Sequence, residues 1–432
     1  MKDVPCHPLC IHRAEWIVPG DGIVISDGAV VTFGGKIVAA GAAKAIRLSY
    51  HGKTIDHGAS VLIPPLVNAH CHLELSPLKW RLSPSSSFSS WVNSLVEARS
   101  RISPDEWLPA VMSAAKGLFE EGVLGIGDVG NLGIASRAME KKDFPPFSGI
   151  FYREIIKPRG EPEDIKPFET GRFPKGKNGA GAAISFGLSS HAVYSASSQV
   201  IIRTKAWDRE RRIPFQIHTA ESPEEMEFVV SGTGPILDLL EERGHCITRE
   251  EIPGCSPVRY LYRLGVLDSD TVCVHAVHVD EGDLEILKRT GASVCLCPRS
   301  NLFLDVGIPQ VERFAAAGIP FALGTDSLAS NDTLSIFAEM SSLASLAPTV
   351  PPGCILTAAT EHGARAIGLS EIGVDAGENH PAPMGRLDPG FRATFLAIRA
   401  DGIRDGEVLE YLVHGVTGPD PVSWICDPLR GA

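Results

Sequence analysis

Long apolar runs and an excess of basic residues are both missing from this chain of 432 residues. No stretch approaches the roughly 20 apolar residues that a helix needs to cross a bilayer, and the first residues lack the basic-then-apolar pattern of a signal peptide. Lys and Arg number 40 against 52 Asp and Glu, which gives a net charge of −12. This balance argues against a nucleic acid or an anionic membrane as a partner held by general electrostatics. We therefore expect a cytoplasmic protein whose partner is a small molecule.

Cysteine is too dilute for a disulfide scaffold, with ten residues in the whole chain. We expect these cysteines to be reduced, because frameworks of disulfides belong to short secreted domains. Hydrophobic residues make up 44% of the sequence, which is enough for one large core and a smaller satellite domain.

Short apolar segments alternate with helical patterns through the middle of the chain. The predicted strands are 61–67, 123–128, 147–152, 183–188, 213–217, 271–274, 292–297 and 320–323. The clearest helical patterns cover 104–121, 222–231, 280–289 and 333–346. Eight successive β/α units predict an α/β fold, a distorted (β/α)8 TIM barrel over residues 63–382, with its chemistry at the C-terminal ends of the strands.

Both ends of the chain have another pattern, in which short Val and Ile runs are broken by Gly and Pro. This pattern covers the N-terminal region and returns in 386–399. We predict one small β-sandwich domain built from residues 1–62 and 383–432. Two loop-like segments, 157–182 and 242–258, are either lids or plain solvated loops.

His70 and His72 close the first predicted strand in the motif Asn-Ala-His-Cys-His. Side chains alternate along a strand, so both imidazoles point the same way, and imidazole is a common ligand of zinc-like metals. Such a pair alone is more often solvated than ligating. Three further polar motifs follow the ends of later strands, namely His-Thr-Ala-Glu at 218–221, Val-His-Ala-Val-His at 274–278 and Gly-Thr-Asp-Ser at 324–327.

In this order the four motifs resemble the amidohydrolase superfamily. Within it they are similar to the mononuclear aminohydrolase branch of nucleoside, guanine and S-adenosylhomocysteine deaminases and triazine chlorohydrolases. The resemblance covers almost the whole chain and implies that His70, His72, His218 and Asp326 hold one divalent metal ion. Zn²⁺ is the expected ion, with Fe²⁺ or Mn²⁺ as alternatives, since all three bind nitrogen and oxygen ligands.

The resemblance also implies the catalytic residues. Glu221 would move protons between water, a ring nitrogen and the departing ammonia, although an acid at this place can also simply face a helix N-terminus. His275 would hydrogen-bond the attacking water, and Asp326 would be both a ligand and a base. A ligand set of three imidazoles and one carboxylate leaves a position for water, whose pKa zinc lowers from about 15.7 to about 7.

Substrate recognition depends on residues outside this shared set. His191, in Ser-His-Ala-Val-Tyr, resembles a substrate-contacting histidine of nucleoside deaminases. Glu74 could accept two hydrogen bonds from the vicinal hydroxyls of a ribose, or pair with Lys79 or Arg81. The guanidinium of Arg299 could bind a carboxylate bidentately, or form an ordinary structural ion pair.

Three segments together are most similar to the aminofutalosine deaminases of the alternative menaquinone route: His-Cys-His-Leu-Glu-Leu-Ser, Cys-Pro-Arg-Ser-Asn and Phe-Ser-Ser-Trp-Val. The implied reaction converts the adenine of 6-aminodeoxyfutalosine to hypoxanthine and releases ammonia. The implied substrate carries a benzoate, which Arg299 or Arg153 would meet. Alternatives are a deaminase for S-adenosylhomocysteine, methylthioadenosine or guanine, a triazine chlorohydrolase, and a metal-binding barrel without catalysis. A homodimer is also implied by the resemblance.

Overall fold

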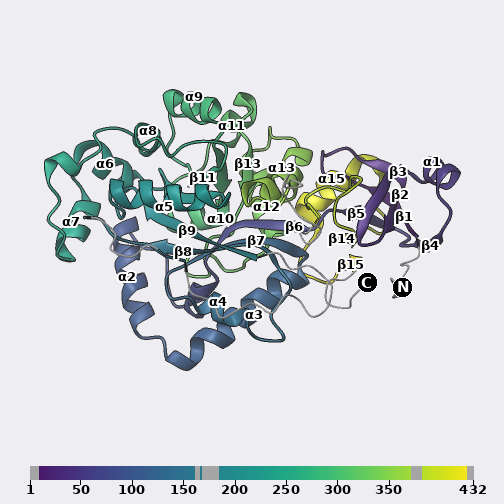
Figure 1. Cartoon of the computed structure of the whole chain (residues 1–432), viewed down its shortest axis with the longest axis horizontal. Coiled ribbons are helices and arrows are strands. Elements are labelled where there is room, and N and C mark those ends of the chain that lie inside the picture. Colours follow the sequence, from purple (N-terminus) through teal and green to yellow (C-terminus); the bar gives the residue numbers. More distant parts are fainter. Residues whose placement is uncertain (1–8, 161–165, 168–183, 371–381, 426–432) are drawn as a thin grey trace.

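The computed structural model describes residues 9–160, 166–167, 184–370 and 382–425. Its larger sheet has eight parallel strands, each beside the next in chain order (Figure 1). They are β6 (Leu66–Cys71), β7 (Val123–Gly130), β8 (Ser148–Ile155), β9 (Ile184–Ala192), β10 (Phe215–Thr219), β11 (Thr271–His275), β12 (Ser293–Leu296) and β13 (Phe321–Leu323). With the helices around it, this sheet confirms the expected (β/α)8 barrel.

The barrel closes where the ends of its first and last strands meet. Cys71 pairs with Asp326 in an isolated parallel bridge, and the amide of Thr325 donates to the carbonyl oxygen of His70 at 3.0 Å. This closure brings two motifs together that are more than 250 residues apart in the chain. The chemistry of both is thereby placed at the C-terminal edge of the strands.

The predicted first strand, residues 61–67, is wrong, because the structure divides it between two sheets. Its first part belongs to β5 (Ser60–Ile63), which pairs with terminal strands, whereas the barrel begins only at Leu66. Pro64 and Pro65 stand at the break. Since proline has no amide hydrogen to donate to a ladder, the chain leaves one sheet there and enters the other.

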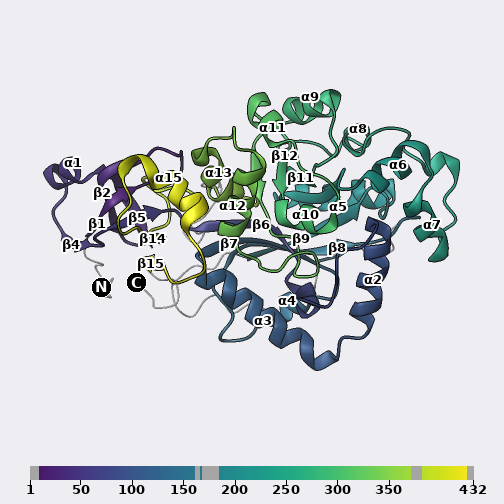
Figure 2. The same cartoon turned by 180° about the vertical axis from the view of Figure 1, so that it is seen from behind.

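The smaller sheet has seven strands and joins the two ends of the chain. Besides β5, its strands are β1 (Cys10–Ile17), β2 (Ile25–Phe33), β3 (Lys36–Ala42), β4 (Lys53–Asp56), β14 (Phe395–Arg399) and β15 (Val422–Ile425). Because β14 lies between β5 and β15, N-terminal and C-terminal strands are side by side at one end of the molecule (Figures 1 and 2). Residues 386–399 were expected to resume the strand pattern, but the strand begins only at Phe395.

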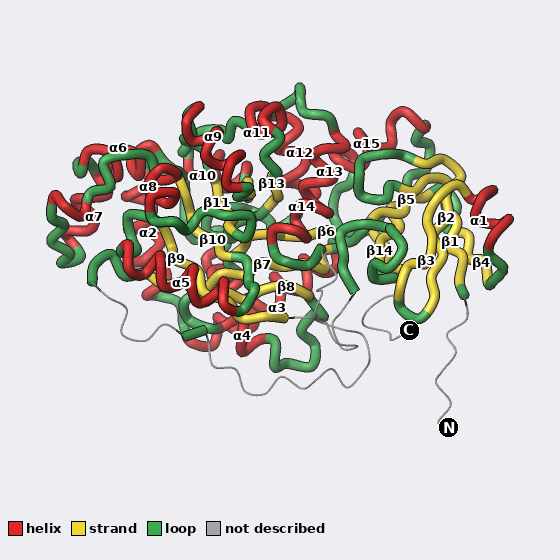
Figure 3. Tube along the Cα trace, turned by 45° about the horizontal axis from the view of Figure 1, so that its top comes forward, coloured by secondary structure: helices red, strands yellow, loops and turns green. Residues whose placement is uncertain are grey.

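Helices surround the barrel strands (Figure 3). They are α2 (Phe88–Ser100), α3 (Pro104–Glu120), α4 (Ile134–Ala138), α5 (Ser198–Glu210), α6 (Pro223–Ser231), α7 (Pro235–Glu242), α8 (Pro257–Arg263), α9 (Glu281–Thr290), α10 (Pro298–Leu304), α11 (Val311–Ala317), α12 (Ile336–Leu346), α13 (Pro352–Ala359) and α14 (Glu361–Ala366). Helix α1 (Ala43–Ser49) packs against β2 and β3 of the smaller sheet, and α15 (Val408–Glu410) packs against α13. The helical patterns expected near 104–121, 222–231, 280–289 and 333–346 are confirmed as α3, α6, α9 and α12.

One continuous apolar core extends from the barrel into the smaller sheet, and it includes Trp16 of β1 and Leu396 of β14. The indole nitrogen of Trp16 also donates to Asp405 at 2.7 Å. The domain boundaries expected at residues 62 and 383 therefore stay a prediction. Seven cysteines of the described residues form no disulfide: Cys71, Cys246, Cys255, Cys273, Cys295, Cys297 and Cys354. No helix of the described residues is long and apolar enough to cross a bilayer.

Candidate active site

The four residues expected to hold a metal come together at the C-terminal edge of the barrel. His70 lies on β6, His72 directly after it, His218 on β10 and Asp326 just after β13. One ligand atom from each lies within 4.8 Å of the others, and all four residues are buried. Between His70 and His72, Cys71 points elsewhere, with its Sγ 3.7 Å from Oδ1 of Asp128.

Hydrogen bonds behind two of these imidazoles leave one nitrogen of each turned toward the cluster. Nε2 of Gln216 donates to the carbonyl of Ala69 at 2.7 Å, so its Oε1 is the acceptor for Nδ1 of His70 at 3.0 Å. Nδ1 of His218 likewise donates to the carbonyl of His191 at 2.8 Å. Nε2 of His70 is buried without a partner. An imidazole fixed this way is a suitable metal ligand, so the residues fit a divalent ion.

Burial also sets the charge states that metal binding needs. It lowers the pKa of His70 to about 3 and lowers the pKa values of His72 and His218, so the imidazoles are neutral. Burial opposes ionisation of Asp326, but the neighbouring histidines and the Ser300 hydroxyl outweigh it and lower its pKa to about 2. Oδ2 of Asp326 accepts hydrogen bonds from Ser300 at 2.6 Å and Ser330 at 2.7 Å.

Glu221 and His275 lie beside this cluster as a second pair. Glu221 immediately precedes Ser222, the N-cap of α6. Burial and the charge of Asp326 raise the pKa of Glu221 well above its usual value. Nδ1 of His275 bonds Oδ1 of Asn301 at 2.9 Å, while its buried Nε2 has no hydrogen-bond partner and lies 3.5 Å from Oε1 of Glu221.

Backbone strain marks the same edge of the barrel. His275 and Asp326 have φ angles of +71° and +55°, and Ala220 beside Glu221 has +52°. The left-handed region costs a non-glycine residue of order 1–3 kcal/mol, and it persists only where the surrounding structure enforces it. These left-handed residues lie at or just after the ends of β11, β13 and β10, where the chain turns beside the metal-ligand cluster.

A cavity of about 220 Å³ opens onto the cluster and contains two of the expected substrate contacts. His191 lines it, with Nδ1 2.5 Å from Oγ of Ser195. Glu74 lines it too, but its carboxylate accepts hydrogen bonds from the backbone amides of Asn131 at 2.7 Å and Leu132 at 3.0 Å. Glu74 therefore holds the loop after β7.

The structure does not bring Arg299 or Arg153 to this cavity. Arg299 forms an ion pair with Asp332 in a separate groove, which is the structural pairing considered as its alternative, and Arg153 donates to the carbonyl of Lys166 at 2.8 Å. Two other arginines line the cavity instead, Arg99 of α2 and Arg243 after α7. No motif marks either of them in the sequence.

Arg99 and Arg243 each have an amide partner, Asn131 and Asn93 respectively. Within the described part of the chain neither guanidinium has an ion-pair partner. The charge of Arg99 reaches inward, where it opposes the rise that burial causes in the pKa of Glu74. The cavity thus has a metal-ligand cluster at its base and, on its walls, two arginines for which the described residues offer no ion-pair partner.

Sequence reasoning also missed Glu154 and Gln216. Gln216 could have been found, because it precedes His218 by two residues and so faces the same side of β10. Glu154, on β8, lines the cavity, and burial raises its pKa to about 8.

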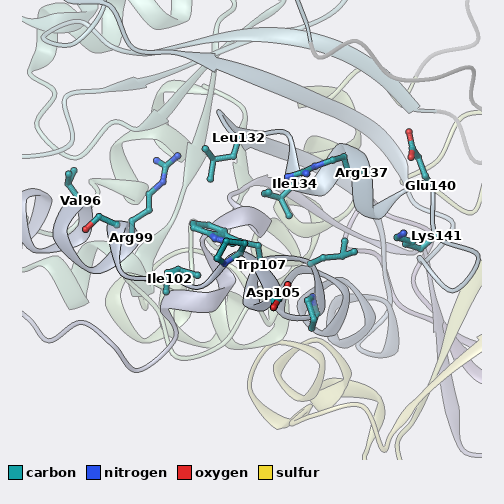
Figure 4. Close-up of a pocket in the computed structure, with 14 residues that line it drawn as sticks. Val96, Arg99, Ile102, Asp105, Trp107, Leu132, Ile134, Arg137, Glu140 and Lys141 are labelled. Atoms are coloured by element: carbon teal, nitrogen blue, oxygen red, sulfur yellow. The ribbon is translucent and has the colours of Figure 1, made fainter.

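A second groove adjoins the cavity and shares Val96 and Arg99 with it. It has a volume of about 1030 Å³ between α2, α3 and α4. Figure 4 shows Arg99 and Leu132 toward one end of this groove and Lys141 toward the other. Of the two loops considered as lids, 242–258 contributes Arg243 to the cavity, whereas most of 157–182 lies outside the described residues.

Comparison with known proteins decides the family. The model of the amidohydrolase family matches residues 61–379, which include every residue of the cluster. The chain belongs to the amidohydrolase family. This amidohydrolase is 32% identical over 361 residues to the aminodeoxyfutalosine deaminase of Deinococcus radiodurans, covering 81% of this chain and 83% of that protein. It is 30% identical over 389 residues to a 5-methylthioadenosine/S-adenosylhomocysteine deaminase of Nitratidesulfovibrio vulgaris, covering 87% and 82%.

Solved structures share the fold of this amidohydrolase. The aminofutalosine deaminase of Helicobacter pylori, in complex with methylthio-coformycin, gives a TM-score of 0.76 at 21% identity and covers 96% of this chain and 99% of that one. An adenosine deaminase from Xanthomonas campestris with bound zinc gives 0.72 at 20% identity, covering 96% and 90%. The family depends on metal, and the three-histidine, one-aspartate cluster matches that dependence.

Proposed function

We propose that this amidohydrolase is a hydrolytic deaminase that replaces the amino group of an adenine nucleoside with oxygen and releases ammonia. The observation that supports it most directly is the single cavity onto which the metal-ligand cluster, Glu221 and His275 all open. The curated relatives reported above are deaminases of adenine nucleosides by name.

His70, His72 and His218, with Asp326, would hold one divalent ion, and Zn²⁺ suits this nitrogen and oxygen set best, with Fe²⁺ or Mn²⁺ as alternatives. Such an ion supplies a nucleophile at neutral pH, because it lowers the pKa of water from about 15.7 to about 7. The neutral imidazoles and the ionised Asp326 carboxylate are the protonation states that this binding requires.

Glu221 is the proton donor to the substrate in this proposal. Burial and the charge of Asp326 raise the pKa of this carboxyl well above its usual value, which favours its protonated form. In that form it can protonate the ring nitrogen beside the amino-bearing carbon as water adds. His275 presents Nε2 toward the same space, since its Nδ1 is engaged by Asn301. That nitrogen can accept a hydrogen bond from the attacking water and hold it in line.

We further propose that the substrate is 6-aminodeoxyfutalosine, deaminated to futalosine in menaquinone biosynthesis. Arg99 and Arg243 support an acidic nucleoside, because two guanidiniums without carboxylate partners line a cavity in a protein of net charge −12. S-adenosylhomocysteine is the second candidate, since it also carries a carboxylate and relatives at up to 30% identity are named for it. Methylthioadenosine, adenosine and guanine lack such a group.

Ammonia release by the zinc-supplemented enzyme against these five compounds tests the proposal. We expect turnover of 6-aminodeoxyfutalosine at the highest kcat/KM. Arg99→Ala and Arg243→Ala should each raise KM for it about tenfold or more, as expected for loss of a charge-assisted contact of roughly 1.5–3 kcal/mol. Arg299→Ala is the matched control, because its side chain lies outside the cavity and should leave KM unchanged.

Each outcome of the panel has a distinct meaning. A preference for S-adenosylhomocysteine would support the proposed role of the two arginines but would reject 6-aminodeoxyfutalosine as the substrate. In a separate assay with a chlorinated triazine, chloride release would retain the metal site and reject a nucleoside as the substrate. Metal binding without turnover of any compound would favour a barrel that binds without catalysis. If KM rose only in the Arg299 variant, Arg299 would be the residue that binds the acidic group of the substrate.

A further inference from the structure

One buried carboxyl group of the cavity has no part in the proposed deamination. The Glu154 side chain, on β8, is 7% exposed. Its Oε1 atom is buried and has no hydrogen-bond partner, although the residue lines the substrate cavity. A buried polar oxygen without a partner costs roughly 1–3 kcal/mol. A ligand group that donates to this oxygen would remove that cost.

A second metal ion is not that ligand. Glu154, His191 and His218 each offer an atom within 4.8 Å of the others. However, the nitrogen of His218 that faces Glu154, Nδ1 at 3.9 Å, donates its hydrogen to the carbonyl of His191 at 2.8 Å. A ring nitrogen that carries a hydrogen cannot ligate a metal. Glu154 therefore needs a hydrogen-bond donor rather than a cation.

The place of Glu154 in the barrel indicates which donor reaches it. The reacting end of the base must face the cluster and Glu221, which stand on β6, β10 and β13. Glu154 is two strands away from β10, on the side opposite β11. It lies within electrostatic reach of Glu74 and Arg99. Glu154 is thus 3.9 Å from His218 of the cluster and within reach of the charge of Arg99 on the cavity wall. A nucleoside that spans these two places would pass Glu154 with its sugar.

The carboxylate of Glu74 is already engaged by backbone amides. Its two carboxylate oxygens accept the amides of Asn131 and Leu132, and an added Cβ on Gly130 would come within 2.6 Å of one of them. The carboxylate is held by the loop after β7. Glu154, by contrast, has an unused oxygen beside His191.

We propose that Glu154 recognises the sugar, with its carboxyl group bound by a ribose hydroxyl of the nucleoside. This inference rests on the proposed function, because it requires a purine riboside in the cavity. The sequence suggested this role for Glu74, whose carboxylate is held by the loop after β7. The enzyme should therefore discriminate between ribosides and deoxyribosides through a residue on β8.

Binding of inosine, 2′-deoxyinosine and 3′-deoxyinosine tests this, measured by isothermal titration with the zinc-supplemented enzyme. The wild-type enzyme should bind inosine at least about tenfold more tightly than one of the deoxy compounds. Glu154→Ala should bind all three within about twofold. Glu154→Gln, which keeps the shape and one acceptor oxygen, should retain a preference of about threefold or more.

An unchanged preference in both variants would overturn the proposal. So would equal binding of the three compounds, or no measurable binding of any, by the wild-type enzyme. If the alanine variant does not fold, as judged by thermal unfolding, the glutamine variant decides through its partial loss of preference. Failure of the proposed function is a separate result, since ammonia release from 6-aminodeoxyfutalosine is measured independently and inosine binding requires no turnover.

Discussion

At the scale of single residues, the proposed deamination depends on the proton of the Glu221 carboxyl group. Glu221→Gln keeps the shape and removes the proton that the ring nitrogen would receive. We expect kcat to fall about 10²- to 10⁴-fold, the usual contribution of a general acid, with metal content unchanged. Ammonia release and metal analysis of the same preparation check this. Loss of the metal along with activity would instead make Glu221 part of metal binding.

Gln216 is a residue that the sequence motifs did not single out and that the structure places behind a metal ligand. It aligns His70, because its amide donates to Ala69 and its oxygen accepts from the imidazole. Gln216→Leu should weaken metal binding about 10- to 100-fold, as outer-shell changes do. Competition with a chelator measures this affinity. Gln310→Leu is the control, because its amide bonds the carbonyl of Val279 away from the cluster. Equal metal retention by both variants would contradict the orienting role.

Glu339 should make stability depend on pH. It is fully buried on α12, and burial raises its pKa from 4.5 to about 8. Between these values the folded protein keeps a proton that the unfolded chain has lost, so this residue's contribution to the free energy of unfolding falls as pH rises.

The change that isolates this effect is Glu339→Gln. It should remove up to about 1.4 kcal/mol per pH unit from the slope of unfolding free energy between pH 4.5 and 8. Urea unfolding at several pH values, compared with the wild type, measures the difference in slope. Parallel curves for the two proteins would show that Glu339 is ionised in the folded state.

At the scale of elements, close strand contacts set the site geometry. A Cβ added to Gly127 on β7 would lie 2.3 Å from the carbonyl oxygen of Ala69 and 3.0 Å from Nε2 of Gln216. Gly127→Ala should therefore destabilise the protein by roughly 1–3 kcal/mol and reduce metal retention through His70. Thermal unfolding and metal content measure the two effects.

The matched control for this change is Gly117→Ala in α3, where an added Cβ meets nothing within 4 Å. Alanine in a helix interior should stabilise the protein by roughly 0.4–1 kcal/mol. Destabilisation by both substitutions would mean that the strand contact at Gly127 is not the cause.

Sequence patterns predicted most of the helices and strands, and their clearest error also concerned a strand. Short apolar runs gave most of the barrel strands, and a helical pattern gave α3, because both patterns are local in the sequence. The apolar run at 61–67 was wrongly predicted to be one strand, because hydrophobicity does not say which sheet buries a residue. Only the two prolines in this run mark the place where the chain passes from one sheet to the other. The place of Arg99 and Arg243 in the cavity could not be predicted from the sequence. Tertiary packing decides which face of a helix lines a cavity.

At the scale of the whole molecule, the question is whether the barrel and the smaller sheet unfold together. Trp424 of β15 stacks on Phe119 of α3 with ring centroids 4.8 Å apart, and its indole nitrogen donates to the Phe119 carbonyl at 3.1 Å. The largest apolar core includes residues of both parts, and two smaller apolar clusters lie among the terminal segments. Tight coupling of this kind predicts one cooperative transition.

Trp424→Ala removes this stacking contact and its hydrogen bond, so it should lower the stability by about 1–3 kcal/mol. Trp80→Ala is the control, since Trp80 is 75% exposed and a surface change of this kind stays within about 0.5 kcal/mol. Calorimetry should show a single transition that moves to lower temperature in the Trp424 variant. A new early transition, with the main one unmoved, would mean that the terminal strands form an independent domain, because only their own unfolding would then depend on the Trp424 contact.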